Sequence, residues 1–142
     1  MDRVRAFGWV YFVMFMLVVG LDFVPAFADD QGRLFGLFTL DLYDNSLHFA
    51  SGAWAGIAAW LGYGPARSYF RIFGPLYFLD GVMGLLLGSG YLDFGIFLYG
   101  PLDLSLAIRF FANLPHLLIG GVAAYVGYVL AAAPRALEPV AA

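Results

Sequence analysis

Four long apolar segments dominate this sequence and constrain its fold more than any other feature. They cover residues 7–28, 46–63, 72–92 and 114–133. A helix that crosses the hydrocarbon core of a bilayer needs about 20 mostly apolar residues. Hydrophobic residues make up 63% of the chain and charged residues only 12%, whereas soluble domains carry about 25% charged residues. We therefore expect an all-α integral membrane protein, a four-helix bundle in a single domain over residues 1–142.

The composition excludes several functional classes. The net charge is −3 and no basic run is present, so we expect no nucleic-acid partner. Cysteine is absent, which removes disulfides, thiolate metal ligands and thiol nucleophiles. The sequence contains no phosphate-binding loop, dinucleotide fingerprint, hydrolase elbow or zinc-protease helix motif, so we do not expect an enzyme.

The distribution of arginines predicts the orientation of the chain. Positively charged connections stay on the cytoplasmic side of a membrane. One side of the predicted spans holds Arg3, Arg5, Arg67, Arg71 and Arg135. The other side holds only Arg33 and Arg109. We expect both termini in the cytoplasm and acidic connections on the outer face.

The first span has a competing interpretation. A basic start, an apolar stretch and Ala26-Phe27-Ala28 also fit a secretory signal with a cleavage site. We favour a retained span, because the apolar stretch is longer than the roughly 7–15 residues of a signal core. Cleavage would leave three spans with the same sidedness.

The two halves of the chain resemble each other at a shift of 68 residues. Asn45-Ser46-Leu47-His48 aligns with Asn113-Leu114-Pro115-His116, and Gly52 aligns with Gly120. Each copy contains two spans, so both copies enter the membrane in the same direction. The repeat predicts two tandem helical hairpins related by an approximate two-fold axis along the membrane normal.

The only two histidines of the chain, His48 and His116, occupy equivalent positions in this repeat. Each follows an asparagine by three residues at the outer start of an even-numbered span. We expect Asn45 and Asn113 to cap these helices, with each histidine in the first turn and facing the packed interior. Asp22 should lie at a comparable depth, as a charge partner or orienting group for the imidazoles.

Two further sets of residues are expected inside the bundle. Small residues at helical spacing let helix backbones approach closely, and those expected to do so are Gly52, Gly56, Gly84, Gly88 and Gly120. Asp80 lies near mid-membrane on the third span and should face inward, with Trp54 and Tyr125 as partners at that depth. A proton or cation pathway through Asp80 is the alternative.

These motifs resemble a family of bacterial membrane proteins, the domain of unknown function 4383. The resemblance rests on Leu42–His48 with Gly52, on Ala112–Gly120, and on Gly20-x-x-Phe23-Val24-Pro25 at the end of the first span. It covers most of the chain and implies a four-span fold in the bacterial cytoplasmic membrane, with no settled activity. Where the family tends to have glycine, this chain has Asp22.

Three functional interpretations remain open. The first is a structural, accessory or binding protein with a polar site around His48 and His116 at the outer face. The second makes these histidines ligands of haem b or another cofactor, whose propionates would meet Arg33 or Arg109; a metal bound by both histidines and Asp22 is its variant. The third is a small transporter or channel that uses Asp80. Besides the bilayer, the partner could be another membrane protein or a second copy of the chain.

Overall fold

The fold is built from helices. The computed structural model describes residues 1–36, 38 and 40–132, and this part of the chain contains no extended strand beyond isolated bridges. Its long helices are α1 (Arg3–Asp22), α2 (Leu42–Leu61), α3 (Tyr63–Leu87) and α5 (Leu106–Tyr128). A short helix α4 (Gly95–Tyr99) and the 3₁₀ turns η1 (Pro25–Phe27) and η2 (Leu130–Ala132) complete it. The expected all-α class is confirmed for the described residues.

Three of the helices are long and apolar enough to cross a membrane. They are α1, α3 and the stretch Leu106–Ala132, which joins α5 to η2. Helix α2 equals α1 in length at 20 residues but carries more polar side chains in its first half. The apolar helices are therefore consistent with contact to a lipid bilayer.

The helix starts differ from those expected. Asp41 caps α2, because its carboxylate accepts the backbone N–H groups of Tyr43 and Asp44 at 2.7 and 3.0 Å. Helix α5 begins after Ser105, whose hydroxyl accepts the N–H of Ile108. The expectation that Asn45 and Asn113 cap these helices, with each histidine in the first turn, is therefore wrong. The helices extend beyond their apolar stretches, so both asparagines and both histidines lie inside them.

The connection between α2 and α3 is also shorter than expected. Residues 64–71, which lie between the predicted spans over 46–63 and 72–92, belong to α3. Only Gly62 separates the helices, at a φ of 134° that residues with a side chain rarely adopt. Pro65 is tolerated there because the first turn of a helix has N–H groups without helical partners.

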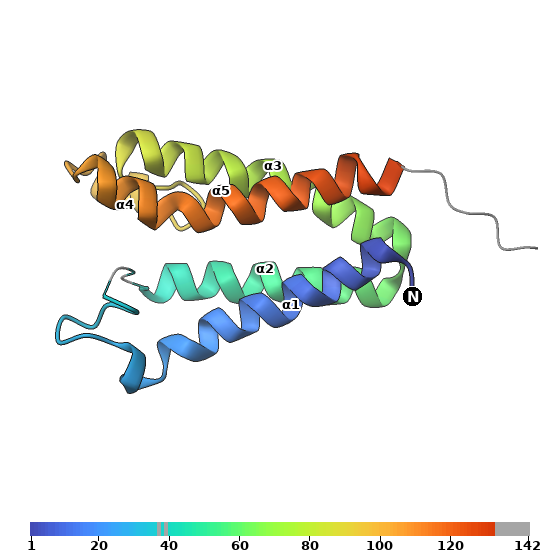
Figure 1. The fold of residues 1–142 in the computed structure, drawn as a ribbon, viewed down its shortest axis with the longest axis horizontal. Helices are drawn as coiled ribbons and strands as arrows, with labels where there is room; N and C mark the ends of the chain where they lie inside the picture. Colours follow the sequence, from blue (N-terminus) through green and yellow to red (C-terminus); the bar gives the residue numbers. More distant parts are fainter. Residues whose placement is uncertain (37, 39, 133–142) are drawn as a thin grey trace, which may run out of the picture.

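The long helices associate in pairs, α1 with α2 and α3 with α5 (Figure 1). The N-terminus and the α2–α3 junction lie at one end of the molecule. The other end, called the loop end below, carries residues 23–41 and 88–105. Within each pair, glycines bring backbones together: a Cβ at Gly52 would lie 2.8 Å from the Cβ of Phe15, and one at Gly120 would overlap the backbone of Phe78.

An aromatic cluster joins the two pairs. Tyr11 and Phe15 of α1 contact Phe73 of α3 edge-on, with ring centroids 6.1 and 5.6 Å apart. On α3, Tyr69, Phe73 and Tyr77 stack in a column with centroid separations of 5.0 and 4.7 Å. All five side chains are buried. This column runs toward the loop end and positions Tyr77 there.

Neighbouring glycines on α5 provide a test of the close α3–α5 contact. We expect Gly120→Ala to destabilise the fold by about 1–3 kcal/mol, because the added methyl group overlaps the backbone of Phe78. At Gly121 the nearest atom to an added Cβ is 3.8 Å away, so Gly121→Ala should be neutral or stabilising by up to about 1 kcal/mol. Thermal unfolding in detergent micelles, followed by circular dichroism, measures both. Equal stability of the two variants would contradict the described packing.

Candidate ligand-binding site

A cavity of about 390 Å³ lies at the loop end, with walls contributed by all four long helices and by both long connections. Side chains from α1, together with Leu34, Phe35, Phe38 and Leu40, make much of its surface apolar. Its polar lining includes Asp44, His48, Tyr77, Asp93, Asn113 and His116. The structure thus brings both histidines into one space with two carboxylates.

His48 of α2 is 8% exposed and uses both ring nitrogens. Its Nδ1 lies 2.7 Å from the backbone oxygen of Asp44. Because a carbonyl only accepts hydrogen bonds, Nδ1 carries the proton and donates it. The hydroxyl of Tyr77 lies 3.3 Å from Nε2 and can donate to it. These contacts suit a neutral imidazole in a fixed tautomer.

His116 of α5 lies on the other side of Tyr77. The His116 and Tyr77 rings stack with centroids 4.5 Å apart, and the two imidazole centroids are 6.5 Å apart. Nε2 of His116 is 3.7 Å from a carboxylate oxygen of Asp80, too long for a hydrogen bond. Its Nδ1 is buried and has no hydrogen-bond partner in the described part of the chain. Tyr77 therefore contacts both histidines and ties the helix pairs together.

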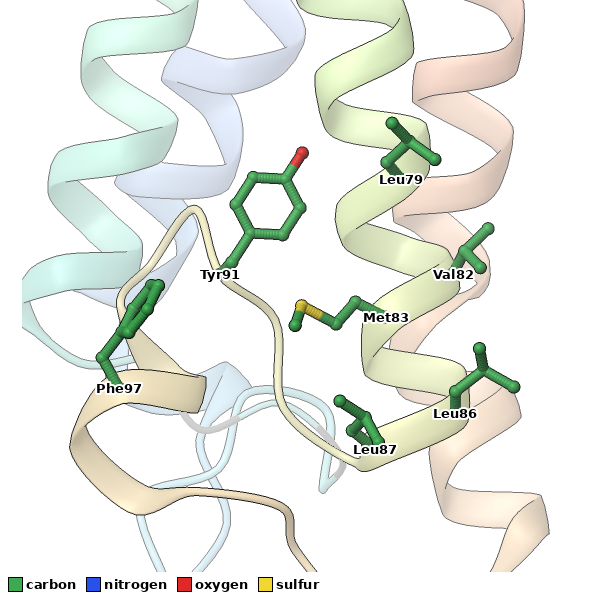
Figure 2. A pocket seen from close by; sticks show the side chains of 7 residues that line it. All are labelled: Leu79, Val82, Met83, Leu86, Leu87, Tyr91 and Phe97. Atoms are coloured by element: carbon green, nitrogen blue, oxygen red, sulfur yellow. The ribbon is translucent and has the colours of Figure 1, made fainter.

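Asp80 holds a segment of chain that turns back along α3. Helix α3 ends at Leu87, and Gly88 takes a left-handed conformation with φ 81°. Residues 88–94, called the return segment below, bring the N–H groups of Tyr91 and Leu92 within 2.6 and 2.8 Å of Oδ1 of Asp80. Figure 2 shows this segment beside α3, and the Tyr91 hydroxyl donates to the carbonyl of Leu76.

The partners expected for Asp80 were wrong. Trp54 instead packs edge-on against Tyr69, with ring centroids 4.9 Å apart, and Tyr125 is 56% exposed. The actual partners could not be predicted from the sequence, because they are backbone N–H groups of a loop. The carboxylate of Asp80 is 4% exposed and accepts hydrogen bonds from this loop, so its geometry gives no support to an ion pathway.

A second hollow, of about 580 Å³, lies on the outer side of α3 (Figure 2). Side chains of α3 together with Tyr91 and Phe97 form it, and none of them is acidic or basic. Several are exposed, including Leu86 at 65% and Phe97 at 75%. This hollow belongs to the apolar outer surface, so the loop-end cavity is the candidate site.

The other predicted polar residues support the walls of the site. Asp22 accepts a hydrogen bond of 2.7 Å from the amide of Asn45, which links the end of α1 to the start of α2. Asn113 donates to the backbone oxygen of Arg109 at 2.8 Å, and its side chain fills the space left by Gly84. Asn113 lines the cavity, whereas Asp22 and Asn45 do not.

Two of the predicted packing glycines, Gly88 and Gly56, allow other parts of the chain to approach closely. Gly88 lines the cavity and starts the return segment in a conformation that favours glycine. A Cβ there would lie 2.6 Å from the backbone oxygen of Leu102. On α2, Gly56 lies against the ring of Phe12, where a Cβ would be 2.9 Å from the nearest ring atom. Both glycines thus permit close approach, one in a loop and one between helices.

The histidines do not fit shared ligation of haem iron. Nε2 of His48 faces the Tyr77 hydroxyl, and Nε2 of His116 faces Asp80. The arginines expected at the propionates are engaged elsewhere, Arg33 with Asp29 at 2.8 Å and Arg109 with backbone oxygens. Among the described residues, no group of three His, Cys, Asp or Glu side chains could hold a metal ion.

Asp44 and Asp93 form a carboxyl pair in the cavity. Asp44 lies in the first turn of α2, before the predicted span over residues 46–63. Burial raises the pKa of Asp44 to about 7, and the nearby carboxylates of Asp93 and Asp41 add to the rise. Asp93 also hydrogen-bonds the Asp44 side chain. The Asp44 carboxyl can therefore hold a proton near neutral pH.

Sequence reasoning missed Asp93 and Tyr77 as site residues. Asp93 lies in a connection without a motif, and only the return segment brings it to Asp44. Tyr77 had a usable signal, because Tyr69, Phe73 and Tyr77 recur every four residues and so share one face of a helix. That face is the buried one.

Removal of the Asp80 carboxylate tests how the return segment is held. In Asp80→Ala, the N–H groups of Tyr91 and Leu92 lose their acceptor, at a cost of about 1–3 kcal/mol for a buried unpaired group. We expect faster hydrogen exchange at these two amides, measured by mass spectrometry in detergent micelles. Asp30→Ala, which changes an exposed outer aspartate, is the control. Unchanged protection in Asp80→Ala would show that other contacts hold the segment.

Comparison with known proteins gives a family and no closer relative. No curated protein and no solved structure matches the chain. One family description, Domain of unknown function (DUF4383), matches residues 6–129, from the first turns of α1 beyond the end of α5. This match covers well over half of the chain and confirms the expected family. The protein belongs to the family described as Domain of unknown function (DUF4383).

Proposed function

We propose that this protein is a small binding protein of the bacterial cytoplasmic membrane. Four helices cross the bilayer as two tandem hairpins, and the loop-end cavity holds an amphipathic small molecule at the outer face. The observation that carries this proposal is the composition of the cavity. It combines an apolar wall with two imidazoles and two carboxylates, in about 390 Å³. Ligand sites in proteins are mostly apolar cavities of about 300–1,000 Å³ with a few convergent polar groups.

The outer surface of α2 supports its role as the fourth span. Phe49, Ile57 and Trp60 of α2 are 56%, 55% and 71% exposed, whereas the polar side chains of His48 and Ser51 are buried. A helix with apolar residues outside and polar residues inside suits lipid as its surroundings. At least two of the polar side chains that lower the hydropathy of α2 therefore face the protein.

Equivalent contacts within the two pairs support the tandem hairpins. The shift of 68 residues holds for α2 and α5, whereas the contacts below pair residues of α1 and α3 that are 66 positions apart. The equivalent hydrogen bonds are Arg5 to the oxygen of Ala59 and Arg71 to that of Gly127. The equivalent close contacts are Gly8 with Ala55 and Gly74 with Ala123. A duplicated hairpin explains both pairs of contacts.

The absence of cysteine makes the topology directly testable. We expect a membrane-impermeant maleimide to label Asp30→Cys and Asp103→Cys from outside the cell, and Gly64→Cys only after permeabilisation. The reason is that α2 returns the chain to the cytoplasm before α3. If α2 does not cross, Gly64→Cys would be labelled from outside and Asp103→Cys would be protected, which contradicts the four-span proposal.

Ligand binding is testable with a photoreactive dodecanol that carries a diazirine in its tail. In phosphatidylcholine nanodiscs, we expect it to cross-link residues that line the cavity, located by mass spectrometry, and to be displaced by plain dodecanol. Ala112→Trp should abolish this cross-linking because Ala112 lines the cavity and the indole fills it. Ala107→Trp, on the exposed start of α5, should not. Cross-linking restricted to lipid-facing residues would refute the binding function.

A further inference from the structure

We propose that the ligand of the loop-end cavity is a lipophilic monocation, a primary ammonium group on a single apolar tail. The inference rests on the proposed binding function and names the class of molecule that the site selects. Three properties of the cavity support this inference: the sign of its charges, the kind of hydrogen-bonding atom left free, and the position of the apolar wall.

The charged lining of the cavity has one sign. Asp44 and Asp93 line it, and no lysine or arginine does so in the described part of the chain. The contacts of His48 suit a neutral ring, so it supplies no compensating charge. Arg109, on the neighbouring part of α5, donates to the backbone oxygens of Leu86 and Leu102. A recess lined by one sign of charge attracts the opposite charge.

Apart from the ring N–H of His116, which has no hydrogen-bond partner among the described residues, the side-chain donors of the lining named below are already used. The hydroxyl of Tyr77 faces Nε2 of His48, that of Ser89 donates to Gly100, and the amide of Asn113 donates to Arg109. The carboxylates keep free acceptor positions, because each of their oxygens can accept two hydrogen bonds. A ligand head group that donates several hydrogen bonds therefore fits better than one that accepts them. A primary ammonium group offers three N–H donors.

The apolar wall gives a place for the tail. Phe15, Val18 and Leu21 lie on successive turns of α1 and line the cavity. Leu34 and Phe35 from the first long connection extend this surface. A single alkyl chain along α1 would bury this apolar surface while its head lies at the carboxyl pair.

The same charges argue against a phospholipid amine as the ligand. Its phosphate would lie within a few bonds of the ammonium group, beside the carboxylates of Asp44 and Asp93. Among the described residues, no lysine or arginine lines the cavity to offset that charge, and an unpaired buried charge is strongly disfavoured. The structure therefore favours an amine that is not part of a phospholipid.

The carboxyl pair also predicts a pH dependence. A cation beside Asp44 favours its ionised form, so binding releases a proton when the free protein is below the Asp44 pKa of about 7. Affinity for the cation should rise as the pH rises through 7. The titratable groups around Asp44 are Asp41 and His48 on α2, Asp93 before α4, Asp22 at the end of α1, Tyr77 on α3 and His116 on α5.

Competition against the photoreactive dodecanol tests the inference with three compounds that share a dodecyl tail and differ in the head group. We expect dodecylammonium to displace it at roughly tenfold lower membrane concentration than dodecanol, and dodecylsulfonate to displace it least. The preference for dodecylammonium should be larger at pH 8 than at pH 5.5. Equal competition by all three would overturn the inference and leave the binding function standing, whereas no displaceable cross-linking in the cavity would refute the function itself.

Variants of single carboxylates test which residue causes the preference for dodecylammonium. Asp93→Asn keeps the acceptor for the N–H of Gly95, so the fold should persist, and the preference for dodecylammonium should fall about tenfold while dodecanol competes as before. Asp103→Asn, which removes a fully exposed outer carboxylate, should leave the preference unchanged. If Asp103→Asn lost the preference for dodecylammonium, the preference would come from the surface charge of the protein rather than from the cavity. If nanodiscs of phosphatidylethanolamine displaced the photoreactive dodecanol without any added amine, the bound ammonium group would belong to a lipid head group. Either of these two results would overturn the proposal.

Discussion

The aromatic column on α3 is the contact on which the rest of the structure depends. Tyr69, Phe73 and Tyr77 receive the rings of α1 on one side, and Tyr77 lies against His116 of α5 on the other. Without this column, the two helix pairs would share little buried surface. Because the column ends at Tyr77, the pairs are tied together up to that level and enclose the cavity beyond it.

The need to satisfy buried polar groups explains why the loop end is built from long connections. In a bilayer, helix ends and buried carboxylates find little water, so the chain must supply partners itself. The return segment does this for Asp80 with two backbone N–H groups, and Arg109 does it for carbonyl groups of Leu86 and Leu102. Asp80, which the sequence suggested for an ion pathway, and Arg109, which it suggested for haem propionates, thus hold the loops that enclose the cavity.

The sequence predicted the helical class and drew attention to His48 and His116, because long apolar runs and a repeated motif are local signals. It placed the helix starts wrongly, since the polar turns from Asp41 and Ser105 continue each helix beyond its apolar stretch. The carboxylate of Asp93 was unpredictable, because its position depends on a loop that folds back onto Asp80. Such contacts arise between segments distant in sequence and leave no periodic pattern.

The return segment also constrains how the chain can assemble during translation. The return segment follows α3 in the chain, so Asp80 gains the N–H groups of Tyr91 and Leu92 only once this segment has folded back along the helix. A carboxylate at the centre of an inserting helix opposes insertion by about 2.5–3.5 kcal/mol. Until the segment has folded back, the apolar residues of α3 alone must outweigh this penalty. In the folded chain, the two N–H groups of the return segment satisfy the carboxylate.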